Sequence, residues 1–376
     1  MKQVAIIGGG IVGMSCAHFL QSLSPEPIEI TIFDDGKGQA TKASAGIISP
    51  WLSQRRNKDW YALAKEGARL YPEWLAEMNL SDDKTIYQQV GTLLFKKNEA
   101  LLDKLYHLAL ERRKEAPEIG DIARLTPEEI KEKIPLIETS QSALFISGGA
   151  RLDGQRLMTA IRRELTKQTV TFEDTAVLNL SYSDKKQWTV HLENRQETFE
   201  QVVLATGAWL PHLLTPLGYE VDVRPQKGQL LVLDTDFPSK DWPVIMPQGE
   251  GDIIPLRHGE ILIGATHENE GGFDLTVDTE TTQPLIDNLI RLVPQLKGTP
   301  IKTVRIGTRA YTSDFLPFFG CVSGQDNLFV ASGLGSSGLT TGPVIGKTLA
   351  QMLLNIPTDI DPSHYSPVPY IKKEAD

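Results

Sequence analysis

Three glycines and one aspartate near the start of the chain have the types and the spacing that bind a dinucleotide. Gly8, Gly10 and Gly13 follow an apolar strand predicted at Val4–Ile7, and Asp34 ends the next predicted strand. In such a loop the first glycine allows a tight turn, the second admits a pyrophosphate against the backbone, and the third lets the helix pack on the strand. The helix N-terminus offers N–H groups to phosphates, and Asp34 can accept ribose hydroxyls. The alternative is a glycine-rich turn without a ligand, which the strand, the helix and the acid together disfavour.

Small and hydroxyl-bearing residues follow the second predicted strand. Thr41, Ser44, Ala45 and Gly46 would let the backbone pass close to a pyrophosphate and a flavin ring, although a loop leading into a helix fits them equally well. Further on, the buried strand Val202–Gly207 ends in small residues, so we expect the chain to return there to the nucleotide-binding sheet. Together these segments favour FAD as the dinucleotide.

The same glycine spacing occurs again near the C-terminal end, at Gly333, Gly335 and Gly338. A second dinucleotide unit needs another strand that carries an acid about 20 residues further on, but Asp359 lies in a proline-rich tail. We therefore interpret this loop as a helix N-terminus directed at the flavin, where its dipole would stabilise negative charge on the reduced ring. With one nucleotide fingerprint the sequence predicts no NAD(P) site, so the electrons would come from a small substrate.

The elements that would hold these residues begin as a strand–helix–strand unit, which predicts a parallel sheet covered by helices. Helical spacing predicts helices at Ile11–Leu23, 57–77, 98–116, Thr282–Val293 and Pro343–Leu354, and another through Leu157, Ile161 and Leu165. In the helix at 98–116 we expect Leu101, Leu105 and Leu108 to face inward. The residues Thr126–Glu129 form a capping box, which marks the start of a further helix. Apolar patterns predict strands at Ile28–Phe33, Thr169–Phe172, Ala176–Ser183, Trp188–Glu193, Thr198–Ala205, Ile301–Tyr311 and Leu328–Ser332, and a β-rich block at Gln229–Ala265.

These elements predict a mixed α/β fold. A Rossmann-like FAD-binding domain of the glutathione-reductase type would be interleaved with an antiparallel β-sheet substrate domain. We expect the FAD-binding domain to comprise residues 1–85, 142–225 and 305–376, and the substrate domain to comprise residues 86–141 and 226–304.

The composition of the 376-residue chain disfavours several classes of protein. Its 38 Lys and Arg against 48 Asp and Glu give a net charge of −10, which argues against binding of nucleic acid or of an anionic membrane surface. No apolar run approaches the roughly 20 residues of a membrane-spanning helix, and the N-terminal apolar stretch is too short for a signal peptide. The two cysteines, Cys16 and Cys321, form neither a metal-ligand pair nor a disulfide framework, so we expect a cytoplasmic protein without a metal site.

Six segments, in order along the chain, resemble the FAD-dependent oxidoreductases of the D-amino-acid oxidase type, which include glycine oxidase, sarcosine oxidase and the D-amino-acid dehydrogenases. They are IIGGGIVGMSCA, ATKASAGII, VVLATGAW, ILIGATHE, GTRAYTSDFLPFFG and LFVASGLGSSGLTTGPVIGK, and they extend from Val4 to about Leu354. The resemblance implies a two-domain fold with a large antiparallel sheet over the flavin, bound FAD, and oxidation of an amine next to a carboxylate.

The resemblance also implies which residues contact FAD. The first glycine loop and the acids after the second strand would hold the pyrophosphate and the adenosine ribose, and the last glycine loop would border the flavin. Val177, in the strand predicted at Ala176–Ser183, would hold the adenine through its backbone. The complete implied set is Gly8, Gly10, Ile11, Val12, Gly13, Asp34, Asp35, Thr41, Ser44, Ala45, Gly46, Ile47, Val177, Gly207, Leu334, Gly335, Ser336, Ser337, Gly338, Leu339 and Thr340.

Arg309 carries most of what the resemblance implies about the substrate. In glycine oxidase-like and D-amino-acid dehydrogenase-like members an arginine at this place binds the substrate carboxylate, to which its planar, permanently charged fork is suited. Sarcosine oxidase-like members have there the cysteine that bonds the flavin, so arginine implies noncovalent FAD. The final glycine loop lacks the second arginine of glycine oxidase, which argues against glycine itself as the substrate. His267 falls where the family places a residue above the flavin, although a loop histidine without such a role fits equally well.

The predicted reaction is oxidation of the Cα–N bond of a D-amino acid, glycine or an N-alkyl glycine by hydride transfer to flavin N5, giving an imino acid and then an oxo acid. Arg309 would orient the Cα–H bond toward N5. Oxygen or a quinone would accept the electrons, and self-association into a homo-oligomer is left open. The alternatives are a 2-hydroxy acid or glycerol phosphate as the substrate, or a flavin-binding protein without turnover.

Overall fold

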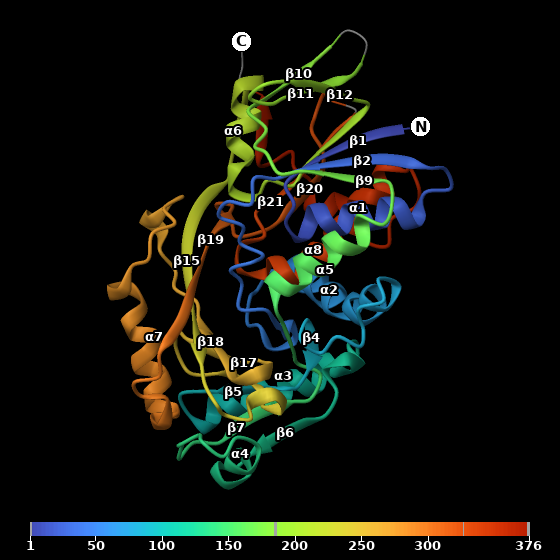
Figure 1. Cartoon of the computed structure of the whole chain (residues 1–376). Helices are drawn as coiled ribbons and strands as arrows, with labels where there is room; N and C mark the ends of the chain where they lie inside the picture. The colour runs from blue at the N-terminus through green and yellow to red at the C-terminus, as the bar shows by residue number, and fades with distance from the viewer. Residues whose placement is uncertain (1, 184–185, 326, 374–376) are drawn as a thin grey trace.

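The computed structural model describes residues 2–183, 186–325 and 327–373, which are arranged around two large sheets (Figure 1). The first sheet has six strands in the order β20-β21-β13-β1-β2-β9. All of its neighbours pair in parallel except β20, which is antiparallel to β21. Its strands are β1 (Lys2–Ile7), β2 (Ile28–Phe33), β9 (Val170–Glu173), β13 (Gln201–Leu204), β20 (Phe318–Cys321) and β21 (Leu328–Ser332).

Both faces of this first sheet are covered, which is why its strands are apolar on both sides. Val4 and Ile6 face a core built with helices α1 (Ile11–Leu23), α2 (Lys58–Glu77), α5 (Gly154–Leu165) and α8 (Gly338–Leu353). Ala5 and Ile7 face a second core, which includes α6 (Leu210–Leu214) and a small antiparallel sheet. The small sheet consists of β10 (Asn179–Tyr182), β11 (Trp188–His191) and β12 (Gln196–Phe199).

The second large sheet has eight strands in the order β19-β15-β18-β17-β16-β5-β7-β6 and is antiparallel except between β16 and β5. Its outer face packs on helix α7 (Thr279–Leu292), which lies along the outside of the molecule in Figure 1. Its inner face turns toward the first sheet. The strands are β5 (Thr92–Phe95), β6 (Ile122–Leu125), β7 (Ala143–Ile146), β15 (Arg224–Asp234), β16 (Val244–Met246), β17 (Asp252–Pro255), β18 (Glu260–Gly264) and β19 (Ile301–Tyr311).

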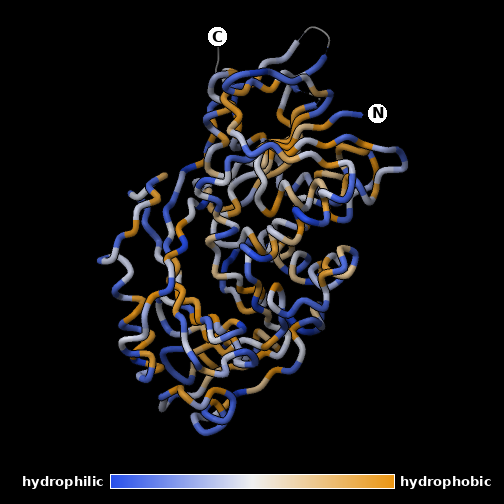
Figure 2. The backbone as a smooth tube through the Cα atoms, in the orientation of Figure 1, coloured by the Kyte–Doolittle hydropathy of each residue, from blue (hydrophilic) through white to orange (hydrophobic). Residues whose placement is uncertain are grey.

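Smaller elements join the two large sheets. Figure 2 shows the apolar segments gathered inside both layers, with polar segments at the loops and the outer helices. The remaining elements are helices α3 (Glu99–Arg113) and α4 (Pro127–Lys133), the sheet of β3 (Ile47–Ile48), β8 (Ala150–Leu152) and β4 (Tyr87–Gln89), and the pair β14 (Tyr219–Val221) and β22 (Ile371–Lys373).

The mixed α/β fold is as predicted, and four elements have the predicted bounds: α1, β2, β19 and β21. The capping box at Thr126 is also present. The final helix, however, begins at Gly338 rather than at Pro343. Proline lacks the N–H that would bond the carbonyl of Leu339, and that carbonyl accepts the Tyr71 hydroxyl instead, so the helix continues through the proline.

Three further predictions were wrong in detail. Leu101 is exposed because Asn98 caps α3, which leaves Leu101 in the solvent-facing first turn and turns Leu102 inward. The strand predicted at Ala176–Ser183 begins only at Asn179, so Val177 precedes it. The strand predicted at 198–205 is two strands in different sheets, because the chain turns at Glu200.

The division into two domains remains a prediction, and the strands cross its expected boundaries. β7 belongs to the eight-stranded sheet although it lies in the segment 142–225 assigned to the FAD-binding domain. β15 begins before residue 226, and β19 runs across residues 304 and 305. The outermost expected limits, residues 1 and 376, lie outside the described residues.

Candidate active site

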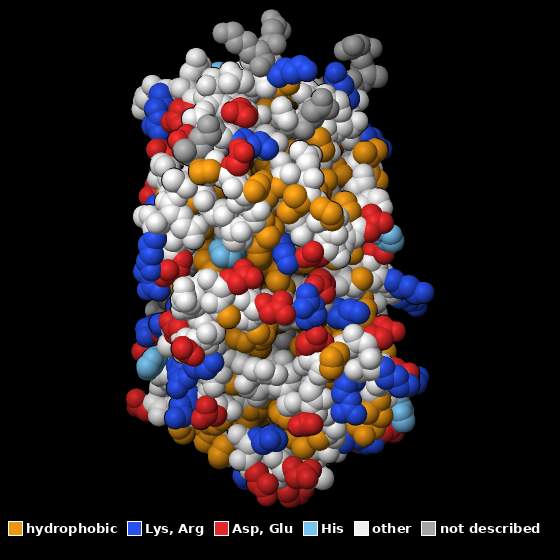
Figure 3. Space-filling view, turned by 90° about the vertical axis from the view of Figure 1, so that its right-hand side faces the viewer, with side chains coloured by type: hydrophobic (Ala, Val, Ile, Leu, Met, Phe, Trp, Pro, Cys, Tyr) orange, Lys and Arg blue, Asp and Glu red, His pale blue; other side chains and the backbone are white. Residues whose placement is uncertain are grey.

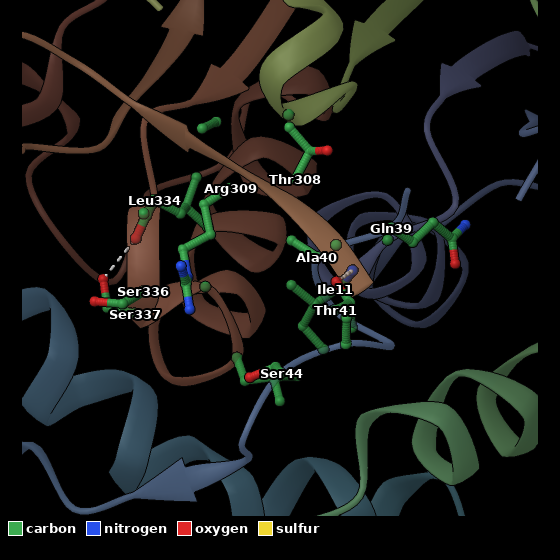
Figure 4. A pocket seen from close by; sticks show the side chains of 18 of the residues that line it. Ile11, Gln39, Ala40, Thr41, Ser44, Thr308, Arg309, Leu334, Ser336 and Ser337 are labelled. Atoms are coloured by element: carbon green, nitrogen blue, oxygen red, sulfur yellow. Dashed lines mark hydrogen bonds between the residues drawn. The ribbon is translucent and has the colours of Figure 1, made fainter. Parts of the chain in front are cut away.

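A cavity of about 910 Å³ is bordered by residues of both large sheets. This volume lies near the upper end of the roughly 300–1,000 Å³ of small-molecule sites. Every predicted site residue borders it except Gly13. Figure 4 shows side chains from four separate parts of the chain around this space: Ile11 at the start of α1, the segment Gln39–Ser44, strand β19 at Thr308 and Arg309, and the last glycine loop.

The first glycine loop has the close contacts that its spacing predicted. Gly8 has φ +110°, and a Cβ there would lie 2.3 Å from the carbonyl oxygen of Ala205. A Cβ on Gly13 would lie 1.9 Å from the carbonyl oxygen of Gly8, so Gly13 lets α1 pack on the loop. Gly13 does not border the cavity, and its expected contact with the cofactor stays a prediction. At the start of α1 the N–H of Ile11 donates to the Thr41 hydroxyl at 3.1 Å.

Asp34 lies at the end of β2 and is held from several sides. Its carboxylate accepts hydrogen bonds from the backbone N–H of Gly9, from the N–H of Gly36 at 2.6 Å and from the Gln39 amide at 2.7 Å. Asp35 and Val177 border the same end of the cavity. The acid is thus fixed beside the glycine loop, where the dinucleotide fingerprint requires a ribose acceptor.

The cavity fits a large, polar cofactor such as FAD. Four polar side-chain atoms of bordering residues are buried and have no hydrogen-bond partner among the described residues: Gln39 Oε1, Ser49 Oγ, Thr206 Oγ1 and Thr308 Oγ1. Buried polar atoms are normally satisfied, so atoms like these mark places where a ligand completes the hydrogen bonding. Gly46 adds a close approach of backbone to backbone, since a Cβ there would lie 1.7 Å from the Leu152 carbonyl oxygen.

The last glycine loop turns into the N-terminus of α8 at the cavity. Residues Gly335–Ser337 form a short 3₁₀ turn, and no side chain caps the N–H groups at the start of α8. The Ser337 hydroxyl accepts a hydrogen bond from the indole N–H of Trp60 at 3.1 Å. The 16-residue helix therefore presents the positive end of its dipole to the cavity, as expected for the flavin side of the site.

Arg309 reaches the cavity from β19. Its Nη1 donates to Gln226 Oε1 at 3.1 Å and to the Thr266 carbonyl oxygen at 2.9 Å. Burial lowers the pKa of Arg309, but a guanidinium remains charged at neutral pH. Over the described residues, Nη2 and Nε make no hydrogen bond and no carboxylate pairs with the group. One edge of the fork is thus fixed by the protein, while the rest is available to an anion.

Gly228 explains how that fork is placed. It lies in β15 opposite Gly307, two residues along from the pair of Gln226 and Arg309. A Cβ on Gly228 would lie 2.6 Å from Arg309 Nη1 and 2.8 Å from both Cζ and Nη2. The guanidinium therefore lies directly over the backbone of this glycine. Sequence reasoning missed Gly228, because only the strand register brings it under Arg309.

His267 and two charged residues that the sequence analysis overlooked also border the cavity. The His267 ring lies 3.2 Å from Glu250 Oε1, and partial burial together with the Arg309 charge lowers its pKa. Burial raises the pKa of Asp252, on β17, to about 7. Arg55, from the segment before α2, donates to Ser336 Oγ at 3.2 Å. The sequence offered one signal for each of these residues. Asp252 is an acid within a predicted β-rich block, and Arg55 belongs to a pair of arginines just before a predicted helix.

Neither cysteine borders the cavity. Cys16 is buried within α1, and the Cys321 thiol donates to the carbonyl oxygen of Gln325 at 3.0 Å. The histidines, cysteines and acids of the described residues form no group of three that could hold a metal ion.

A glycine loop on a parallel sheet and a cavity shared with an antiparallel sheet are the arrangement expected of a flavin-dependent oxidoreductase. The chain belongs to the DAO family of FAD dependent oxidoreductases, whose model matches residues 3–352. FAD is accordingly its cofactor, and the residues bordering the cavity would hold it.

Three relatives cover nearly the whole chain. An uncharacterized oxidoreductase, YurR, of Bacillus subtilis is 36% identical and covers 98% of this chain and 99% of its own. The glycine oxidase of Pseudomonas aeruginosa is 28% identical, with 97% and 98% covered. The crystal structure of iminodiacetate oxidase from Chelativorans sp. BNC1 superposes with a TM-score of 0.90 at 31% identity, covering 97% of this chain and 98% of that chain.

The distribution of surface charge and the character of the helices bear on binding to other molecules and to membranes. Figure 3 shows acidic and basic side chains interspersed over one face rather than gathered by sign. Among the described helices, none has the length and apolar character needed to cross a lipid bilayer.

Proposed function

We propose that the protein oxidises the C–N bond of a small amino acid or N-substituted glycine, in which the amine carbon also bears a carboxylate. The observation that carries this proposal is Arg309, a charged fork without a carboxylate partner among the described residues, held at the cavity wall by Gln226 and Thr266. The amine substrates named for the iminodiacetate and glycine oxidase relatives support the same class. When bound, FAD supplies the acceptor for the hydride that leaves the substrate carbon.

The residues of the chain act mainly by orientation. Arg309 binds the substrate carboxylate through the donors that the protein leaves unused, which fixes the position of the adjacent Cα–H bond. Gly228 keeps the guanidinium close to β15. Burial and the Arg309 charge lower the pKa of His267, which favours the neutral ring, so we expect it to contribute a hydrogen-bonding ring rather than a charge at the cavity.

The competing substrates differ in the charge that they need. A 2-hydroxy acid would use the same carboxylate-binding residue, and a glycerol phosphate would use two cations. Lys227 and Arg305 are not available as a second cation, because Lys227 pairs with Asp274 and Arg305 pairs with Asp153. The amine is our first choice because the iminodiacetate oxidase and glycine oxidase relatives are named for amine substrates. A cytoplasmic location and oxygen or a quinone as electron acceptor remain part of this proposal.

Anaerobic mixing with a panel of candidate substrates tests the function. The holoenzyme is titrated with sarcosine, iminodiacetate, glycine, D-amino acids, 2-hydroxy acids and glycerol 3-phosphate while the flavin absorbance is followed. We expect one or more amines to bleach the flavin and the hydroxy compounds to leave it oxidised. Bleaching by a hydroxy acid or by glycerol phosphate alone would contradict the proposal.

A further inference from the structure

Arg55 is a second guanidinium at the cavity that the function described so far does not use. It lies between the 3₁₀ turn Pro50–Leu52 and helix α2, and it borders the cavity together with Arg309. Among the described residues, no carboxylate lies within ion-pair distance of Arg55 or of Arg309. Two guanidinium groups and the Lys96 ammonium thus border one cavity without a carboxylate partner among the described residues, in a chain that has ten more acidic than basic residues.

Arg55 is held in place rather than free in solvent. Its guanidinium stacks over Trp60, with Cζ 4.6 Å from the ring centroid, and Nη2 donates to Ser336 Oγ at 3.2 Å. Trp60 itself donates to Ser337. Both anchors of Arg55 therefore end on the last glycine loop, which fixes the cation before any ligand arrives.

The last glycine loop also lies next to Arg309. Strand β19 contacts the 3₁₀ turn Gly335–Ser337, and the ring of Tyr311 on β19 would lie 2.4 Å from a Cβ on Gly335. Figure 4 shows Arg309 extending from β19 toward the segment that carries Ser336. Arg55 and Arg309 are thus both linked to the last glycine loop, Arg55 through Ser336 and Arg309 through the contact of strand β19 with that loop. The chain lacks an arginine within the loop itself, and Arg55 brings one there from another element.

We propose that Arg55 binds a second carboxylate of the substrate, so that the preferred substrate is a secondary amine carrying a carboxylate on each side. This inference rests on the proposed function and names its substrate class. A monocarboxylate would pair with one guanidinium only, whereas a dicarboxylate would pair with both. Arg55 is the more exposed of the two, so the second carboxylate would lie nearer the opening of the cavity.

The chemistry balances for iminodiacetate as the simplest member of the class. Loss of a hydride from one methylene and of a proton from nitrogen gives a carbon–nitrogen double bond, with bound FAD as the two-electron oxidant. One water molecule adds to the carbon–nitrogen double bond, and cleavage of the carbon–nitrogen bond then gives glyoxylate and glycine. The second carboxylate takes no part in bond breaking, so Arg55 contributes to binding and orientation.

Binding of two unreactive probes to the holoenzyme tests the inference without turnover. Oxydiacetate has two carboxylates and methoxyacetate has one, and both have an ether oxygen in place of the amine. Calorimetry compares the wild type, Arg55→Ala and the control Arg56→Ala, which removes the same charge from the exposed neighbour that does not border the cavity. We expect Arg55→Ala to weaken oxydiacetate roughly tenfold more than methoxyacetate, as for loss of one charge-assisted hydrogen bond, and Arg56→Ala to change neither.

Three results would overturn the inference. Equal weakening of both probes by Arg55→Ala would mean that Arg55 serves the first carboxylate, and no weakening of either would mean that it binds no substrate. Flavin reduction by glycerol 3-phosphate that depends on Arg55 would assign the cation to a phosphate instead. If oxydiacetate binds through Arg55 but no amine reduces the flavin, the dicarboxylate site stands and the proposed function fails.

Discussion

Replacement of Gly228 by alanine should impair substrate oxidation without touching the cofactor. The added Cβ would lie 2.6 Å from Arg309 Nη1 and 2.8 Å from Cζ, whereas an ordinary contact is 3.4 Å or longer. The guanidinium must therefore move by about 1 Å, away from the position that Gln226 and Thr266 define. A misplacement of about 1 Å in a positioning group can cost on the order of 100-fold in rate. We expect a loss of this order in the efficiency of flavin reduction.

Stopped-flow mixing under anaerobic conditions measures that efficiency at several substrate concentrations. FAD content and Tm should stay close to those of the wild type, because the new methyl group meets a flexible side chain rather than backbone. The same glycine replacement in an Arg309→Ala background serves as the control. There it should cause little further loss, since the side chain that it displaces is gone.

Additive losses in the double variant would refute this reasoning. Such a result would mean that the methyl group obstructs the substrate or FAD directly, and that Gly228 has no role in placing Arg309. Wild-type efficiency in Gly228→Ala would equally contradict the requirement for a close approach at this position.

Three further predictions address the cofactor site and the buried acid. Asp34→Ala should weaken FAD binding roughly 10- to 100-fold, because a charged acceptor worth about 1.5–3 kcal/mol is lost. The control Glu29→Ala, on the exposed face of β2, should leave FAD affinity unchanged. Equal FAD affinities of the wild type and Asp34→Ala in a fluorescence titration would count against the ribose contact. Gly13→Ala should lower Tm and FAD affinity, since overpacking of this kind costs about 1–3 kcal/mol, and an unchanged Tm would show that α1 can shift freely. The pKa of Asp252 is about 7 in the folded protein against 3.8 ordinarily, so the wild type loses stability as pH rises between these values. Asp252→Asn should therefore be more stable than the wild type at pH 8, by at most roughly 4 kcal/mol. This gain should vanish near pH 4, and a gain independent of pH would exclude ionisation of Asp252 as its cause.

The parts of the fold that sequence reasoning predicted are those fixed by local signals. The glycine loop, α1 and β2 follow one another within the first 34 residues, so strand, turn and helix signals were enough to place them. Val177 was expected in a strand because its neighbours are apolar. Its segment instead borders the cavity and belongs to no sheet.

The parts that sequence reasoning missed depend on contacts between distant segments. Arg55 and Ser336 are 281 residues apart, and nothing near either residue in the sequence indicates their hydrogen bond. Gly228 acquires its role only from the register of β15 and β19, and Asp252 only from the enclosure of β17 by the surrounding walls. The residues on the substrate side of the site are thus brought together only by tertiary contacts, whereas those on the nucleotide side belong to one local sequence motif.

The central claim is that Arg309 binds the carboxylate of an amine substrate. Its most direct test compares the reductive half-reaction of the wild type, Arg309→Lys and Arg309→Ala with the best amine from the anaerobic panel. Removal of one partner from a buried charge pair costs about 2–5 kcal/mol, so the alanine variant should lose at least ~30-fold in efficiency. The lysine variant should lose less, because it keeps the charge without the fork, and FAD content should be unchanged in both. Wild-type reduction rates with wild-type substrate affinity in Arg309→Ala would contradict the claim.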